Sequence, residues 1–206
     1  MKTPELKRLI VATMTGMREH AEELRELDAA LGDGDLGITV SSGAKAVIAA
    51  LEDMPDDVAP ADVAKSCARA FASANPSTMA ALVAGALLAG SKVWDRDEVS
   101  YQDALVFAEA SAASISTRGK SQVGDKTILD AMAPAIDALK RSAGPEDGLK
   151  AAIAAAREGV ENSKSLKSQR GRAAWLQERS IGLADPGATA YVRFLEELEA
   201  ARSHTA

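Results

Sequence analysis

Apolar and polar positions repeat with a helical period along most of the chain. In the first 27 residues the apolar side chains recur three or four positions apart: Leu6, Leu9, Ile10, Met14, Met17, Ala21, Leu24 and Leu27. This spacing places them on one face of a helix. Thr3 fits the cap of that helix, and Pro4 fits its first turn. The pattern predicts a first helix that ends near Asp28.

The same periodicity continues through the rest of the chain. It predicts further helices at about 38–51, 61–72, 77–93, 101–117, 126–142, 146–163 and 186–202. A weaker and shorter helical pattern covers residues 171–180. No segment alternates apolar and polar residues with the β-branched enrichment that is typical of a strand. Because no fixed-period repeat or long linker divides residues 1–206, we expect one all-α domain, a helical bundle with short loops.

Composition and charge limit the partners that this bundle is expected to have. The net charge of −6 argues against nucleic acid, because phosphate backbones are bound by basic surfaces. No apolar run approaches the ~20 residues that span a bilayer, and the N-terminus "MKTPELKR" differs from a secretory signal. The single cysteine, Cys67, cannot form an internal disulfide, which suits a reducing cytoplasm. We expect Cys67 to be a small buried apolar residue.

One segment gathers acidic residues between two helical patterns. "LDAALGDGDLGITVSSG" (27–43) places Asp28, Asp33 and Asp35 close to Gly32, Gly34 and Gly37. Glycine disfavours helix, and in a curled loop Asp33 and Asp35 can point the same way while Asp28 reaches the same spot. Three carboxylates held together repel one another unless cations intervene. Oxygen ligands without nearby histidine or cysteine favour Mg²⁺ or Ca²⁺, and Mg²⁺ usually takes further ligands from waters and substrate phosphates.

These residues by themselves support two interpretations equally. One is a metal site that binds phosphate, and the other is a solvated acidic turn, in which Asp and Gly are common. An EF-hand is excluded, because its twelve-residue ligand pattern and closing glutamate are missing.

Several other loops carry residues that are typical of helix entrances. They are "SANPST" (73–78), "GKSQVGDKT" (119–127) and "LADPGAT" (183–189). In the first and third, Asn75–Pro76 and Asp185–Pro186 each fit a cap followed by a first-turn proline. Helix entrances that converge can hold phosphate, because their free N–H groups favour an anion. The sequence leaves open whether these entrances converge.

Three segments together resemble the nucleotide-binding L subunit of dihydroxyacetone kinases. They are residues 27–43, "RGKSQVGDKTILDAMAPAIDAL" (118–139) and "RGRAAWLQERSIGLADPGATAY" (170–191), which match in order and spacing. The resemblance implies a barrel of eight antiparallel helices with the nucleotide at one end. It also implies that Asp28, Asp33 and Asp35 hold two Mg²⁺ ions that bridge the phosphates of ATP or ADP.

The resemblance extends to the remaining site residues. The implied nucleotide contacts are Leu36, Gly37, Ile38 and Thr39 along the phosphates, Pro76 and Ser77 in a covering loop, and Gly119, Ile128, Arg172, Asp185, Pro186 and Gly187 around the pocket. Arg172 is the candidate for a forked phosphate contact, and with the three aspartates it forms the expected catalytic set. Lys126 and Arg179 lie inside the matched segments and fit structural ion pairs equally well.

The chain departs from this family's pattern near the phosphates. The covering loop, "SANPSTMAALVAG", has no glycine before Gly85, where the family usually has a glycine- and serine-rich loop. Leu36 and Leu183 occupy positions that are often histidine in bacterial subunits. Thr39 replaces a common asparagine, although threonine also occurs there in single-chain ATP-dependent relatives. These changes concern the nucleotide grip, the phosphate donor and the acceptor rather than the metal ligands.

The family holds its sugar on a histidine of a separate K subunit or domain. The two histidines of this chain, His20 and His204, lack the surroundings of such a carrier and fit structural or solvated roles. We therefore expect a cytoplasmic kinase subunit that transfers the γ-phosphoryl group to a small hydroxyketone held by a K-type partner. ATP could exchange at each turnover, which Thr39 slightly favours, or a phosphotransfer-system protein could rephosphorylate bound ADP. The oligomeric state is open, with a homodimer among the options.

Three other functions are also compatible with parts of the sequence. A non-catalytic nucleotide-binding regulator of the same fold is favoured by the altered "NPSTM" loop. A purely structural helical protein leaves the order of the three matched segments unexplained. A kinase for another carrier-bound acceptor, such as a fatty acyl group, ranks lower because the chain lacks the extra domain of such relatives.

Overall fold

The computed structural model describes residues 1–205, and this part of the chain folds into helices without an assigned strand. The elements are α1 (Thr3–Met17), η1 (Arg18–His20), α2 (Ala21–Leu31), α3 (Leu36–Glu52), α4 (Pro60–Ala74), α5 (Thr78–Ser91), α6 (Tyr101–Gly119), α7 (Leu129–Arg141), α8 (Pro145–Ser163), η2 (Arg172–Ser180) and α9 (Pro186–Thr205). The expectation for His204 concerns a side chain that lies outside the described residues.

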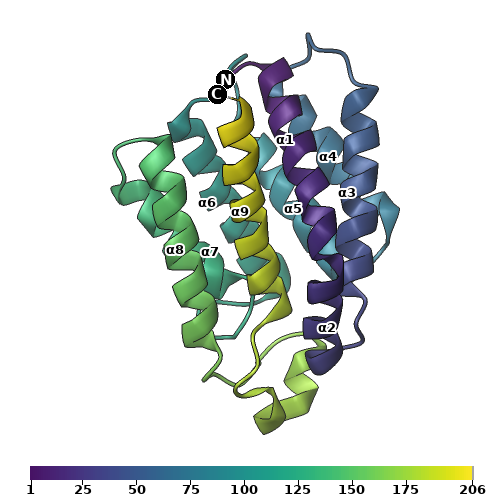
Figure 1. Ribbon diagram of the computed structural model, residues 1–206, viewed down its shortest axis with the longest axis vertical. Helices are drawn as coiled ribbons and strands as arrows, with labels where there is room; N and C mark the ends of the chain where they lie inside the picture. Colours follow the sequence, from purple (N-terminus) through teal and green to yellow (C-terminus); the bar gives the residue numbers. More distant parts are fainter. Residues whose placement is uncertain (206) are drawn as a thin grey trace.

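Successive helices run in alternating directions and close a ring (Figure 1). Each helix from α3 to α9 packs against the next one, α9 packs against α1, and α1 packs against α3. α1 and α2 follow one another along the same side and together act as one bent first helix. The expected barrel of about eight antiparallel helices is confirmed.

The alternating directions sort the loops between the two ends of the barrel. Both chain termini lie at the upper end in Figure 1, together with the loops that follow α3, α5 and α7. The lower end holds loops 32–35, 75–77, 120–128 and 164–185. The entrances of α3, α5, α7 and α9 therefore share one end, which settles the question that the sequence left open.

The first helix differs from its prediction at both ends. It is interrupted by η1, and α2 continues past Asp28 to Leu31, whose side chain is buried and extends the packed face by one turn. The proposed cap at Thr3 is wrong, because the N-cap is Lys2, whose N–H donates to Glu5 Oε2 at 2.9 Å. The Thr3 hydroxyl is buried and instead donates to the Val58 carbonyl at 2.7 Å.

Two other helix entrances also differ from their predictions. The N-cap of α5 is Ser77, not Asn75, because the Ser77 hydroxyl accepts from the Ala80 N–H; Asn75 is the C-cap that ends α4, and its side chain binds Thr39 instead. α7 begins at Leu129 rather than at 126, because Lys126 has a left-handed backbone (φ +59°). The Asp130 carboxylate holds this turn by accepting from the N–H groups of Gly124 and Thr127, each at 2.7 Å.

Small apolar residues fill the interior of the barrel. In the cluster between α7, α8 and α9 they include Ala131, Ala135, Ala152, Ala156 and Ala188, each fully buried. Alanine lets helix axes approach closely, so the shape of this core follows from the alanine-rich composition. Cys67 is buried in the cluster between α1, α3 and α4, as predicted, and burial raises the pKa of its thiol to about 12.

None of the described helices is both long and apolar enough to cross a membrane.

Candidate functional site

The three aspartates meet at the lower end of the barrel. Asp28 lies in the last turn of α2, Asp33 in the following loop, and Asp35 at the N-cap of α3. One carboxylate oxygen from each lies within 4.8 Å of the other two. The chain can turn sharply between Asp33 and Asp35 because Gly34 adopts φ +75°. The structure thus brings together the acids that the sequence places within eight residues.

Arg172 joins this cluster from the first residue of η2. Its Nη1 pairs with Asp33 Oδ1 and lies 3.7 Å from Asp35 Oδ2. A single guanidinium leaves the cluster with an excess of negative charge, which attracts a further cation. Asp33, Asp35 and Arg172 are each about half exposed, so waters and phosphate oxygens have access. This set of carboxylate donors fits Mg²⁺, which prefers hard oxygen ligands and completes its shell from solvent and substrate.

The entrance of α3 follows directly on the aspartates. The Leu36 N–H donates to Asp28 Oδ2 at 3.2 Å, and the Thr39 N–H donates to the Asp35 carbonyl at 2.9 Å. Between them, the N–H groups of Gly37 and Ile38 have no acceptor within residues 1–205. Free N–H groups and the positive end of the helix dipole favour an anion beside the acidic cluster. This turn can therefore bind phosphate through its backbone.

The loop with Pro76 and Ser77 is tied to this entrance by Asn75. Its side-chain amide donates to the hydroxyl of Thr39 at 2.9 Å, and Thr39 is buried. The Ser77 hydroxyl accepts from the Ala80 N–H at 3.1 Å and caps α5. Sequence reasoning missed the role of Asn75, since its only signal was an Asn–Pro pair that also fits a helix cap.

The turn 185–187 lies beside the entrance of α7. A Cβ on Gly187 would lie 3.7 Å from the Cβ of Ile128, so the structure brings these two predicted residues together. Asp185 Oδ2 accepts from the Ala188 N–H at 2.8 Å, which confirms the predicted cap before Pro186. Burial raises the pKa of Asp185 to about 6, and the nearby Asp130 charge adds to this, whereas the Ala188 N–H and the Lys126 charge oppose it.

Gly119 ends α6 at the same end of the barrel. A Cβ built on Gly119 would lie nearest the side chains of Ser121 and Leu82, and the following Lys120 is left-handed (φ +49°). None of these contacts involves the aspartate cluster. Gly119 therefore shares the end of the barrel with the other predicted residues but is not in contact with the aspartate cluster.

The two basic residues with undecided roles make no ion pair in the described part of the chain. Arg179 is exposed. Lys126 is almost fully buried, and its ammonium donates to three backbone carbonyls of the segment 164–180. Ion pairing was one of the roles considered for both residues, and the structure shows it for neither.

His20 has a structural role, as one of the two alternatives proposed. Its Nε2 lies 2.7 Å from Glu197 Oε1 of α9, and its Nδ1 lies 3.7 Å from Glu23 Oε2. These contacts join the break between α1 and α2 to the last helix.

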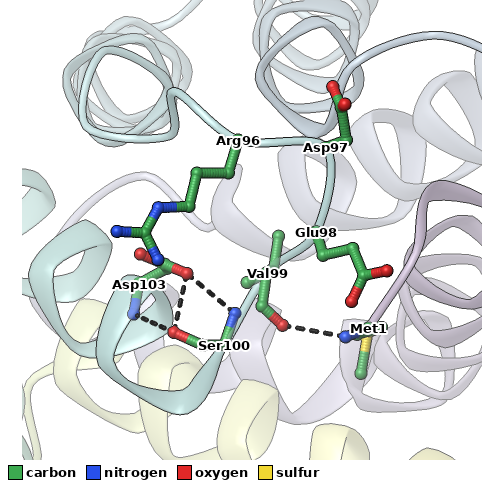
Figure 2. A pocket seen from close by; sticks show the side chains of 7 residues that line it. All are labelled: Met1, Arg96, Asp97, Glu98, Val99, Ser100 and Asp103. Carbon is green, nitrogen blue, oxygen red and sulfur yellow. Dashed lines mark hydrogen bonds between the residues drawn. The ribbon is translucent and has the colours of Figure 1, made fainter.

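A hollow of about 400 Å³ lies at the opposite end of the barrel, near the chain start (Figure 2). Several of its polar groups satisfy one another: the Met1 ammonium donates to the Val99 carbonyl at 3.0 Å, and Ser100 and Asp103 cap α6 reciprocally. It contains no residue of the predicted site. We therefore take the aspartate cluster as the candidate site.

Comparisons with known proteins show which family the chain resembles. The family model of the DAK2 domain matches residues 30–200. The chain is 34% identical to the ADP-binding subunit DhaL of PEP-dependent dihydroxyacetone kinase 1 from Listeria innocua, over 84% of this chain and 83% of that one. It is also 34% identical to L-erythrulose 1-kinase from Mycolicibacterium smegmatis, over 94% of this chain but only 35% of that one.

A solved structure shares the fold. The dihydroxyacetone kinase from C. freundii, determined in complex with AMP-PNP and Mg²⁺, superposes with a TM-score of 0.75 at 21% identity. The match covers 94% of this chain and 33% of that one. At this identity the likeness speaks for the fold alone.

Proposed function

The chain belongs to the DAK2 domain family of nucleotide-binding dihydroxyacetone kinase subunits, and we propose that it binds Mg²⁺ and a nucleotide in such a kinase. The observation that carries this proposal is the cluster of Asp28, Asp33 and Asp35 with Arg172, beside the free N–H groups of α3. The name of the Listeria innocua relative, an ADP-binding subunit, supports the nucleotide.

The proposed chemistry is direct transfer of a phosphoryl group, in which the protein mainly positions and neutralises charge. Asp28, Asp33 and Asp35 would hold the two Mg²⁺ ions, which supply positive charge to the phosphates when bound. The N–H groups of Gly37 and Ile38 would bind phosphate oxygens. The guanidinium of Arg172 is held at the cluster by Asp33. One of its N–H groups would donate a hydrogen bond to the phosphoryl group that is transferred.

The acceptor in this proposal is a hydroxyl of a small hydroxyketone on a separate K-type subunit in the cytoplasm. Large apolar side chains are exposed at the lower end of the barrel, where such a subunit would dock. They are Ile38 (59% exposed), Val123 (60%), Trp175 (82%), Ile181 (45%) and Leu183 (37%). Exposed apolar residues gathered at one end mark a protein interface, and tryptophan often dominates its binding energy. We assign this face to the K-type subunit, because the aspartate cluster, where the phosphates would bind, lies at the same end of the barrel.

The phosphate donor is either ATP or a phosphotransfer-system protein that rephosphorylates bound ADP. The Listeria innocua relative is named as PEP-dependent. The two regimes separate in a turnover assay with the K-type subunit and hydroxyketone. ATP alone sustains many turnovers in the first regime, whereas in the second a single turnover stops until the phosphotransfer proteins are added.

Nucleotide binding is the first part of the proposal to test. We would measure the melting temperature of nucleotide-free protein with ADP or ATP, with and without Mg²⁺. A ligand at ~100 times its dissociation constant stabilises the folded state by roughly 2.7 kcal/mol. We expect a Mg²⁺-dependent increase that Asp33→Asn abolishes. Asp57→Asn is the control, since Asp57 is an exposed loop acid outside the cluster. Absence of any shift in the parent protein would contradict the proposed function.

A further inference from the structure

We propose that Lys126 is a positioning residue, which holds the segment 164–182 in the conformation that delivers Arg172 to the aspartate cluster. This inference rests on the proposed function, because it concerns how one residue of that site is placed. The argument starts from the surroundings of the Lys126 ammonium.

Lys126 is among the most completely buried large side chains of the protein, with 1% of its surface exposed. Its Nζ donates to the carbonyl oxygens of Lys164 at 3.2 Å, Leu166 at 3.0 Å and Ser180 at 2.5 Å. An ammonium has three N–H donors, and here each one has a carbonyl acceptor. No carboxylate in residues 1–205 lies within ion-pair distance of it. Three carbonyl dipoles thus replace water around a buried cation, an arrangement that requires this segment to be folded.

The three carbonyls come from both ends of one irregular segment. Lys164 and Leu166 lie at its start, and Ser180 lies at its end. The Lys164 carbonyl also accepts from the Gly182 N–H at 2.7 Å, so the two ends meet at one point. Between them the backbone is not regular: Gly171 has φ +63° and Gln177 has φ +51°. A segment of this kind has few regular backbone hydrogen bonds of its own, and the Lys126 ammonium joins its two ends.

The residue before Lys126 binds the same segment closer to Arg172. The Asp125 carbonyl accepts from the Gln169 N–H at 3.0 Å, and its carboxylate accepts from Arg170 Nε at 2.9 Å. Arg170 is two residues before Arg172. The turn that presents Asp125 and Lys126 is itself fixed by the Asp130 carboxylate. A rigid turn before α7 therefore fixes the position of the backbone that leads to Arg172.

Loss of the Lys126 ammonium should loosen the two joined ends of the segment 164–182. Lys126→Met keeps most of the apolar stem but removes one donor from each of three carbonyls. Those of Lys164 and Ser180 keep the N–H groups of Gly182 and Leu183, whereas the Leu166 carbonyl regains a partner only if water enters. The backbone at Arg172 would then be less fixed, so each contact of its guanidinium would cost more conformational entropy. We expect Lys126→Met to weaken Mg·ADP binding by roughly tenfold or more, the range for hydrogen bonds to charged groups. Arg172→Gln should weaken it to a similar extent.

The decisive experiment is a double-mutant cycle by titration calorimetry on nucleotide-free protein. Lys126→Met, Arg172→Gln and the double variant are each titrated with Mg·ADP. If Lys126 acts through Arg172, the double variant binds no more weakly than the weaker single variant. Fully additive losses would mean that Lys126 acts elsewhere and would overturn the inference. Lys120→Met is the matched control: Lys120 is an exposed lysine of the same loop, and we expect unchanged affinity. Lys126→Arg, which restores a cation with several donors, should recover part of the loss.

A second readout uses a divalent cation without nucleotide. Arg172 shares Asp33 with the metal, so its release should strengthen binding of Mn²⁺, followed by electron paramagnetic resonance. Removal of an exposed ion-pair partner corresponds to about a two- to fivefold gain. We expect this gain in both Arg172→Gln and Lys126→Met, opposite in sign to their effect on Mg·ADP. General damage to the fold would weaken both ligands, so a weakening of Mn²⁺ binding in a folded Lys126→Met protein would overturn the inference.

The same measurements separate failure of this inference from failure of the proposed function. If the parent protein binds neither Mg·ADP nor Mn²⁺, the proposed site itself is wrong, and no residue positions it. If Arg172→Gln weakens Mg·ADP and Lys126→Met does not, only the role of Lys126 is wrong. Should Lys126→Met fail to fold, Arg170→Gln breaks the ion pair between the half-exposed Arg170 and the buried Asp125, which joins the same two segments. Its smaller loss must then also be non-additive with Arg172→Gln; additivity would overturn the inference.

Discussion

Gly37 offers the sharpest test of how the candidate site is built, because helices α2 and α3 approach each other at this residue. A Cβ added at Gly37 would lie 2.0 Å from the carbonyl oxygen of Ala21 and 3.0 Å from the Cβ of Arg25. The first neighbour is backbone, which cannot rotate away as a side chain can. To restore even 3.0 Å, the entrance of α3 must move by about 1 Å, and close-packed interiors resist such shifts.

Gly37→Ser should therefore destabilise the protein. Added atoms in a well-packed region cost ~1–3 kcal/mol, and the gain from replacing glycine in a helix offsets less than ~1 kcal/mol. We expect a net loss of about 1–2 kcal/mol in the free energy of unfolding, measured by urea denaturation and circular dichroism with an unchanged m-value. The shift also separates Leu36 from Asp28, whose hydrogen bond is already 3.2 Å long. Stabilisation by Mg·ADP should fall as well.

Gly144→Ser provides the matched control. No atom lies within 4 Å of a Cβ built at Gly144, and its φ of −169° is extended backbone that any residue adopts. Serine also suits its position at the N-cap of α8. If the two serine variants show the same urea midpoint and the same response to Mg·ADP, the close approach of α2 and α3 does not shape the site.

Three further predictions concern other parts of the molecule. Burial raises the pKa of Asp185 from 3.8 to about 6, so the folded state holds this proton more tightly than the unfolded chain, and stability falls as pH rises through this window. Asp185→Asn retains an acceptor for the Ala188 N–H but does not titrate. Its free energy of unfolding in urea should fall less than that of the parent between pH of about 4 and about 7. An equal fall would contradict the buried carboxyl. Trp175→Ala should leave Mg·ADP stabilisation unchanged but weaken binding of the K-type subunit by about tenfold or more in calorimetry, since exposed tryptophans at interfaces often carry ~2 kcal/mol; unchanged affinity would remove Trp175 from the docking face. Cys67 should react with a disulfide reagent at pH of about 8 at least ~100-fold more slowly in native protein than in urea, because burial raises the pKa of its thiol to about 12; rapid native labelling would mean that the α4 face opens.

The sequence determined the elements of this fold. The spacing of apolar residues predicted each helix of the barrel within a few residues, because amphipathic periodicity is a local property that packing then uses. The gathering of Asp28, Asp33 and Asp35 followed from the same local logic: the three lie within eight residues, and Gly34 supplies the turn between two of them. The cap at Asp185 was also predicted, because its acceptor and donor are three residues apart.

Only the tertiary structure decided the contacts between distant segments. The Thr3 hydroxyl was assigned to a cap but binds Val58, and Asn75 was assigned to a cap but binds Thr39. Lys126 carried no local signal for three carbonyls that lie 38 to 54 residues away. Thr3 and Asn75 each had a plausible local partner, and packing against a distant segment selected another one. The sequence contains the acids of the candidate site, but Arg172 meets Asp33 only because the ring of helices closes and brings both loops to the same end.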